Sequence, residues 1–114
     1  MKWESDELTS QPIRVRQTCL KVWNFMVEIK SFEIKNKLGL HARAAAKLVN
    51  VSTQYKSRIF IERDGMEVNG KSLLSILTLA CPKGSWITIR TEGIDALDAI
   101  ESLGMLIGDK FGED

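Results

Sequence analysis

A single histidine stands at the start of an alanine-rich stretch, where an imidazole could accept a phosphoryl group. The stretch LGLHARAAA, residues 38–46, contains His41, the only histidine of the chain, and Arg43 follows two residues later. Alanine is the strongest helix former, so we expect a helix to begin here. The first amides of a helix lack partners within it and bind anions, and Arg43 adds a guanidinium suited to phosphate oxygens.

This arrangement would help a phosphoryl acceptor both before and after transfer. The positive end of the helix favours the neutral imidazole, which is the nucleophilic form, over the imidazolium. After transfer, the same amides and the guanidinium would stabilise the added anion. A histidine that merely begins a helix gives the same local pattern, so the residues around His41 leave that alternative open.

A second stretch suggests phosphate chemistry of another kind. GMEVNGKS, residues 65–72, matches the nucleotide-binding pattern G-x-x-x-x-G-K-[ST]. In that motif, a loop whose amides surround the phosphates follows a buried parallel strand. Here Asp64-Gly65 is a strong hairpin signal, and the following MEV continues as a strand whose amides are needed for pairing. We therefore interpret the match as a coincidence.

Ser72 begins the run SLLSILTLA, residues 72–80, which we interpret as a short helix with Ser72 as its N-cap. The apolar residues of the run surround such a helix instead of forming one stripe, yet a short helix buries only one side. The surplus leucines should therefore be exposed and able to bind a partner. A fully buried short helix is the alternative.

The chain from Met26 onward supplies the elements that must position these groups. Alternating or helical periodicity predicts strands over 32–36, 58–62, 66–68 and 85–90, and helices over 41–54, 72–80 and from an N-cap at Asp95 onward. The predicted order is β-α-β-β-α-β-α. Each strand has one polar face, which predicts an α+β protein, an open-faced β-sandwich whose antiparallel sheet is covered by helices on one side only.

Composition and charge exclude several classes of protein. The chain has 114 residues, 27% of them charged and 44% hydrophobic, and a net charge of +1, which suits one folded domain without bulk attraction to nucleic acid. No apolar run has the length of a membrane span or the form of a signal peptide, so we expect a cytoplasmic protein without membrane insertion. The two cysteines and one histidine lack metal-ligand spacing, and we expect no metal or other cofactor.

Residues 1–25 stand apart from this pattern. They mix charged, polar and apolar types without a sustained period, and Pro12 would interrupt a helix. Met26 lies just ahead of the first regular strand. We therefore expect residues 1–25 to be an appended, partly disordered or mispredicted extension, and residues 26–114 to form the domain.

Two stretches taken together resemble one known family. LGLHARAAAKLV, residues 38–49, followed by NGKSLLSILTLACPKGSWITI, residues 69–89, is similar to HPr, the histidine-containing phosphocarrier of the bacterial sugar phosphotransferase system. The resemblance covers roughly residues 27–112. It implies a four-stranded antiparallel sheet covered by three helices. It also implies that His41 accepts a phosphoryl group on Nδ1 from phosphorylated enzyme I and passes it to a IIA component.

Further roles are implied by the resemblance alone. Arg43 matches the active-site arginine of the family, and Ser72 matches the serine that HPr kinase/phosphorylase modifies in many bacteria. The partner-docking surface of the family is matched by Leu73, Leu74 and Leu77. Family members usually have proline where Ala44 stands here, a change that affects the stiffness of the helix start and adds one amide near the phosphate.

A carrier of this kind works only together with its partner enzymes, and we expect it to be a monomer. The alternative is a regulatory binding protein of the same fold, including a nitrogen-related paralogue, that acts through partner docking and Ser72. Retention of His41 and Arg43 favours the carrier, because a purely regulatory protein has no need of the nucleophile.

Overall fold

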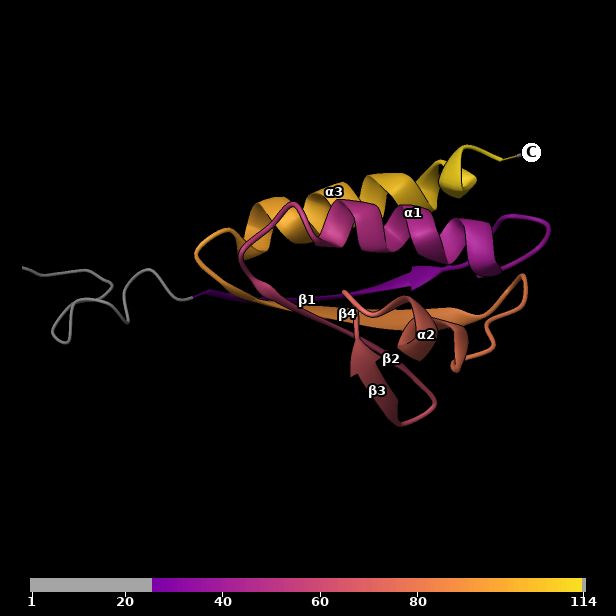
Figure 1. The fold of residues 1–114 in the computed structure, drawn as a ribbon, viewed down its shortest axis with the longest axis horizontal. Coiled ribbons are helices and arrows are strands. Elements are labelled where there is room, and N and C mark those ends of the chain that lie inside the picture. Colours follow the sequence, from indigo (N-terminus) through magenta and orange to yellow (C-terminus); the bar gives the residue numbers. More distant parts are fainter. Residues whose placement is uncertain (1–25, 114) are drawn as a thin grey trace, which may run out of the picture.

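The computed structural model describes residues 26–113, which form a four-stranded sheet and three helices (Figure 1). The strands are β1 (Met26–Glu33), β2 (Arg58–Arg63), β3 (Met66–Asn69) and β4 (Trp86–Gly93). The helices are α1 (Ala42–Ser52), α2 (Leu73–Leu77) and α3 (Ala96–Gly108), and the 3-10 turn η2 (Lys110–Gly112) follows α3. The expected extension, residues 1–25, and residue 114 lie outside the described residues.

All strand pairs of this sheet are antiparallel, and the strands lie in the order β1-β4-β2-β3. The two central strands bury their isoleucines on the side of the helices, namely Ile59, Ile61, Ile87 and Ile89. On the uncovered face, the Arg90 guanidinium lies 4.2 Å from the centre of the Phe60 ring across the β4–β2 pair. The predicted α+β class, element order and open-faced sandwich are confirmed.

β1 occupies a different range from the predicted strand, 32–36, because it runs from Met26 to Glu33. Within this strand the charged Lys30 lies on the helix side, where the ammonium lies 5.7 Å from the centre of the Phe32 ring. Ile29, by contrast, is exposed on the open face. This inverted alternation gives no apolar signal on the core side, so the pattern failed to detect residues 26–31 of the strand. Residues 34–36, which were predicted as strand, follow its end.

The hairpin between β2 and β3 has the geometry that its turn residues predict. Asp64 has φ 52° and Gly65 has φ 83°, and a type I′ turn requires positive φ at both central residues. Met66–Asn69 then pairs with β2 along its length. The stretch GMEVNGKS is therefore a turn, a paired strand and a helix start, and its amides do not form a phosphate-binding loop.

α2 is shorter than the predicted helix, 72–80. It ends at Leu77. Hydrogen bonds between residues three positions apart continue the turn from there to Ala80, whose φ is 49°. A residue in this left-handed conformation terminates a helix. The predicted N-cap is confirmed, because the Ser72 hydroxyl accepts a hydrogen bond from the Ser75 amide at 3.4 Å.

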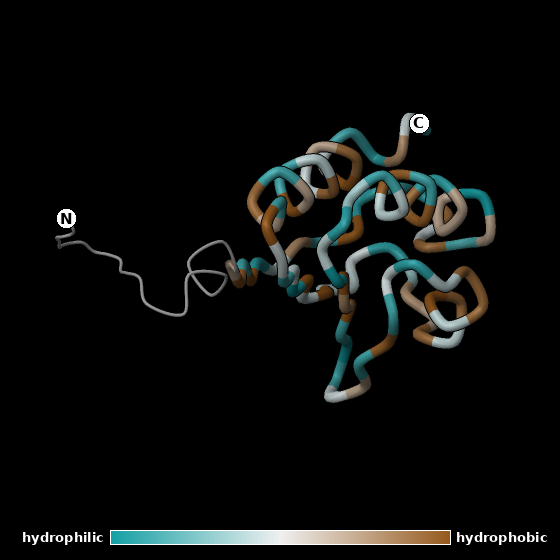
Figure 2. Tube along the Cα trace, turned by 60° about the vertical axis from the view of Figure 1, so that its left-hand side comes forward, coloured by the Kyte–Doolittle hydropathy of each residue, from teal (hydrophilic) through white to brown (hydrophobic). Residues whose placement is uncertain are grey.

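α1 and α3 lie side by side over the sheet (Figure 1) and bury the apolar residues that alternate with hydrophilic ones along them (Figure 2). The stripe of α3 consists of Ala99, Ile100, Leu103 and Ile107, all buried. Cys81 also lies in the core, where burial raises the pKa of its thiol, so it acts as a small apolar side chain. Within residues 26–113, no helix has the length and apolar character needed to cross a membrane.

Asp95 precedes α3 as predicted, but its side chain does not cap that helix. The carboxylate instead accepts hydrogen bonds from the amides of Lys56 and Ser57, at 2.9 Å each, and from the Ser57 hydroxyl. Burial by itself would raise the pKa of Asp95, yet the hydrogen bonds from Ser57 and Lys56 hold this pKa below its ordinary value. The predicted capping bond is thus wrong, and the residue ties the turn before β2 to the start of α3.

We expect Asp95→Ala to lower the free energy of unfolding by about 2 kcal/mol at neutral pH, because three donors lose their acceptor. A depressed folded-state pKa means that the carboxylate contributes stability above its unfolded pKa and loses it as the pH falls through the folded pKa. The difference between wild type and variant should therefore shrink in acid. Urea titrations over a pH series measure both effects, with Asp98→Ala, an exposed change in the first turn of α3, as the control. A difference that grows in acid would contradict the assignment.

Candidate functional site

His41 is the N-cap residue of α1, with an extended backbone at φ −82° and ψ −179°. The loop before it is fixed against the segment after α2, because the Leu40 amide donates to the Cys81 carbonyl at 2.8 Å. Gly39, at φ 68°, makes this close approach possible, since a Cβ there would lie 2.4 Å from the Cys81 carbonyl oxygen. The loop Leu-Gly-Leu therefore holds the His41 imidazole at the N-terminal end of α1.

The first turn of α1 leaves its amides available to an anion. The first amide bonded within the helix is that of Ala45, which donates to the His41 carbonyl at 2.8 Å. The His41 side chain makes no capping bond, and the turn contains no acidic residue. The amides of residues 42–44 consequently have no partner within the helix and form a positive end. Ala44 contributes one of these amides, which a proline would remove.

The His41 ring contacts a carboxylate from the far end of the chain. Its Nε2 lies 2.8 Å from Glu113 Oε2 and 3.0 Å from Oε1. A carboxylate only accepts, so Nε2 carries the hydrogen, and the lone pair of the neutral ring is then on Nδ1. The hydrogen bond from His41, assisted by a weaker one from Asn36, holds the pKa of Glu113 below its usual value. Among residues 26–113, Nδ1 has no hydrogen-bond partner.

Glu113 is held in turn by a fully buried amide. Asn36 Nδ2 donates to the Gly39 carbonyl at 2.7 Å and to Glu113 Oε1 at 3.1 Å. Both partners are acceptors, which assigns the amide orientation, because the reverse orientation would set Asn36 Oδ1 against two oxygens. This Oδ1 has no partner in the described part of the chain. The side-chain amide of Asn36 therefore donates two hydrogen bonds through Nδ2, while its Oδ1 accepts none from the described residues.

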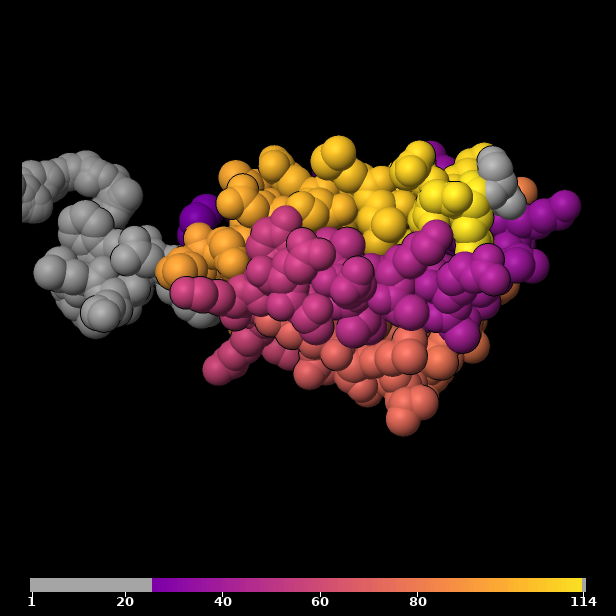
Figure 3. All heavy atoms as spheres, turned by 45° about the horizontal axis from the view of Figure 1, so that its top comes forward, coloured from indigo at the N-terminus to yellow at the C-terminus, as the bar shows by residue number. Residues whose placement is uncertain are grey.

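A left-handed turn after α3 brings Glu113 to the histidine. Lys110 and Phe111 have φ 55° and 57°, which reverses the chain direction. The Phe111 side chain is buried in the core, and its carbonyl accepts a hydrogen bond from Lys47 Nζ at 2.6 Å. We call residues 110–113 the C-terminal hook. Figure 3 shows this end of the chain (yellow) lying against the start of α1 (purple).

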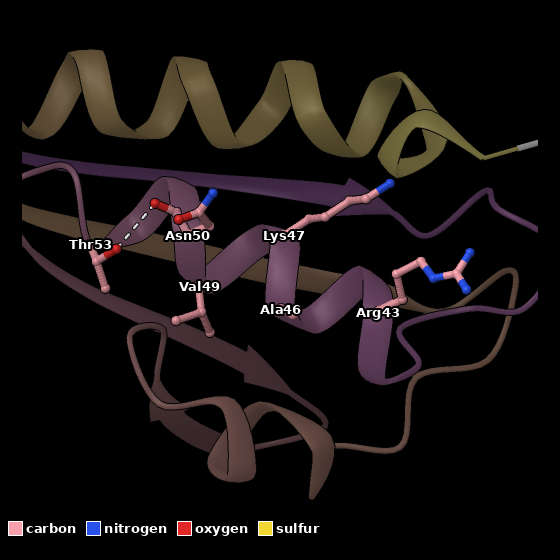
Figure 4. A pocket seen from close by; sticks show the side chains of 6 residues that line it. All are labelled: Arg43, Ala46, Lys47, Val49, Asn50 and Thr53. Atoms are coloured by element: carbon pink, nitrogen blue, oxygen red, sulfur yellow. Dashed lines mark hydrogen bonds between the residues drawn. The ribbon is translucent and has the colours of Figure 1, made fainter.

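Arg43 is exposed on the first turn of α1, and its guanidinium extends away from the helix (Figure 4). It lines one end of a shallow depression along α1, together with Lys47. Within residues 26–113, Arg43 has no hydrogen bond or ion pair, so its side chain is available to turn towards an anion. The structure places Arg43 and His41 on the same turn without bringing the two side chains into contact.

α2 packs beside α1 and exposes part of its apolar surface. Leu74 is 77% exposed and Leu73 is 37% exposed, whereas Ile76 is completely buried. Leu77 is half-buried against the core. A fully buried helix is therefore excluded, and the N-cap Ser72 stands directly before the two exposed leucines.

The sequence pattern failed to identify Glu113 and Asn36 as part of the site. Glu113 lies 72 positions from His41, and Asn36 lies 77 positions from Glu113, so no local period joins them. Asn36 is the last residue of the predicted strand 32–36, and its residue type alone does not specify a contact with Glu113.

Comparisons with known proteins agree on one family. The family model described as "PTS HPr component phosphorylation site" matches residues 29–109. The phosphocarrier protein HPr of Neisseria meningitidis is 43% identical over 84 residues, which are 74% of this chain and 94% of that protein. The HPr-like protein Crh of Halalkalibacterium halodurans is 49% identical over 78 residues, covering 68% and 92% of the two chains. The crystal structure of HPr-C-His from Thermoanaerobacter tengcongensis has a TM-score of 0.74 and 41% identity, covering 76% of this chain and 98% of its own.

Proposed function

This chain belongs to the HPr family of phosphocarrier proteins, and we propose that it carries a phosphoryl group on His41 Nδ1. Phosphorylated enzyme I is the proposed donor, and a IIA component of the phosphotransferase system is the proposed acceptor. The observation that carries this proposal is the 2.8 Å contact between Nε2 and Glu113, which leaves the lone pair on Nδ1 at the tip of α1.

Each part of the site has a task in this transfer. The lone pair of Nδ1 attacks the phosphorus of a phosphohistidine on the donor, while the donor's P–N bond breaks and its electron pair returns to the donor ring. The unpaired amides of α1 bind the phosphoryl oxygens, and Arg43 turns towards them as a planar, multiply donating cation. The His41 side chain is 27% exposed, which leaves one edge of the ring open to a partner.

Incubation with phosphoenolpyruvate and enzyme I tests the proposal. The expected product is a labelled protein whose phosphate is lost in acid and retained in alkali, as befits a phosphohistidine. Transfer of the label to a IIA component completes the test. A folded protein that takes up no label would refute the carrier and leave the regulatory alternative of the same fold, which the 49% identical relative named Crh favours.

We also propose that Ser72 is a regulatory phosphorylation site for an HPr kinase/phosphorylase. Its hydroxyl caps α2 and stands beside Leu73 and Leu74. A phosphate there would add about −1.5 to −2 charges next to the exposed leucines and hinder docking of an apolar partner surface. ATP and the kinase should modify wild type but not Ser72→Ala, and modified protein should accept label from enzyme I more slowly.

The exposed leucines are the proposed docking surface, and Leu74 has the largest exposed fraction of them. We expect Leu74→Glu to slow phosphoryl transfer from enzyme I about tenfold, as loss of an interface hot spot does, while the fold is retained. Transfer rates and urea unfolding measure the two effects. Met105→Glu on α3 is the matched control, because Met105 is 76% exposed against 77% for Leu74. Unfolding of Leu74→Glu, or equal slowing by both variants, would contradict the assignment.

The proposed partners imply a cytoplasmic protein, and we propose that it acts as a monomer. Each transfer step needs only one His41 and one docking surface, both of which belong to a single chain. Sedimentation analysis of the intact protein, with and without enzyme I, tests this part of the proposal.

A further inference from the structure

We propose that a basic depression at the start of β2 binds a small molecule that carries a phosphate group. Three cationic side chains line it, Lys56, Arg58 and Lys71, and its volume is about 420 Å³. Binding sites for small molecules usually have volumes of about 300–1,000 Å³. None of the lining residues belongs to the site at His41, so this inference goes beyond the carrier role and does not depend on it.

The depression forms where β3 stops short of β2. Asn69, the last residue of β3, pairs with Phe60, so the first two residues of β2 extend past the end of β3. The chain then passes closely over β2, because the Gly70 amide donates to the Ile59 carbonyl at 2.7 Å. A Cβ on Gly70 would lie 2.5 Å from Ile59 Cγ2. These contacts fix the wall of the depression without a ligand.

The polar side-chain groups that remain available in the depression are donors. Lys56 and Arg58 are exposed, and their side chains have no hydrogen bond or ion pair within residues 26–113. Lys71 Nζ donates to the Tyr55 carbonyl at 2.7 Å, which positions the ammonium and leaves two of its three hydrogens available. Asn69 Oδ1 accepts from the Lys71 amide at 2.8 Å, so Asn69 Nδ2 is still available to donate. Three positive charges and one amide therefore face a common space.

The acidic residues beside the depression already have partners. Glu92 lies opposite Arg58 across the β2–β4 pair, but its carboxylate accepts a hydrogen bond from Arg90. The Asp95 carboxylate accepts three hydrogen bonds from the turn before β2. Among the described residues, no carboxylate lines the depression itself. The positive charge of its side chains is therefore available to a bound anion.

The number and geometry of these donors favour phosphate over a single carboxylate. One cation matches the charge of a carboxylate, whereas a phosphate monoester carries about −1.5 to −2 charges at neutral pH. The planar guanidinium of Arg58 can donate to two phosphate oxygens at once, and the two ammonium groups add compact charges. The half-buried Phe60 ring supplies an apolar wall for the organic part of the ligand.

A titration of the full chain with inorganic pyrophosphate tests the proposal. Two-dimensional ¹H–¹⁵N NMR at constant ionic strength should show saturable shifts of the amides of residues 56–60 and 69–71. Lys56→Gln and Arg58→Gln should each weaken binding about fivefold, the size expected for a partly exposed ion pair. Lys83→Gln is the matched control, because it removes the charge of an exposed lysine in the turn before β4 and should leave the affinity unchanged.

Four outcomes would overturn the inference. Pyrophosphate could shift none of these amides, or its saturable shifts could be confined to residues 41–45 at the start of α1. Equal weakening by Lys83→Gln would mean general attraction by charge. Shifts caused by hexaglutamate but not by pyrophosphate would assign the depression to an acidic protein partner. Enzyme I takes no part in these measurements, so they stand whether or not the carrier proposal fails.

Discussion

His41→Ala is expected to take up no phosphoryl label from phosphoenolpyruvate and enzyme I, a loss of a thousandfold or more, on the order of that seen when a nucleophile is removed. His41 is the only histidine of the chain, so no neighbouring imidazole can replace it. The fold should survive, because the His41 side chain makes no capping bond and is partly exposed. Loss of the contact with Glu113 should have only a small effect on stability, because the ring and the carboxylate are both partly exposed to solvent.

Labelling followed by acid or alkali treatment measures this result, and urea titration shows that the variant is folded. Arg43→Ala is a useful companion, since it should slow labelling without abolishing it: the amides of α1 remain. Label that persists on His41→Ala and resists acid would mean that a hydroxyl, such as that of Ser72, accepts the group. That outcome would contradict the assignment of His41.

The second large effect concerns stability, because Phe111→Ala is expected to lower the free energy of unfolding by about 3–5 kcal/mol. The ring is 1% exposed and belongs to the main core, so its loss leaves a cavity in that core. A small domain has about 5–15 kcal/mol of stability in all, and this variant should be close to unfolding. The hook would also lose its anchor, and Glu113 its fixed position at the ring.

Urea unfolding measures the loss, and two variants accompany it. Met105→Ala removes a side chain of similar apolar character that is 76% exposed, so it should change stability by no more than about 0.5 kcal/mol. Phe111→Leu keeps most of the buried volume and should cost much less than alanine. A small effect of Phe111→Ala would mean that the hook is not anchored by this ring, and the account of how Glu113 is held would need revision.

The parts of the structure that could be predicted are those in which neighbouring residues determine the outcome. The Asp64-Gly65 turn was predictable because few residue pairs tolerate positive φ at two successive positions. The helix start at His41 and the N-cap at Ser72 follow from residues within one turn. The order of elements, and hence the open-faced sandwich, follows from their periods.

The parts that could not be predicted depend on contacts between distant segments. Asp95 has the residue type and position of a capping residue, yet donors at Lys56 and Ser57 compete for its carboxylate. Residues 26–31 of β1 were missed because the charged Lys30 faces the helices, where its ammonium lies over the Phe32 ring. Glu113 reaches the site only because two residues other than glycine adopt left-handed conformations, which no residue type there signals.

The position of the C-terminal hook has a practical consequence for how the protein is produced. A purification tag fused after residue 114 would begin two positions after Glu113, whose carboxylate contacts the His41 ring. A polyhistidine tag would add imidazoles close in sequence to that carboxylate, whereas a tag that is removed by a protease before measurement leaves His41 as the only histidine. Kinetic comparisons between preparations therefore need chains with identical ends.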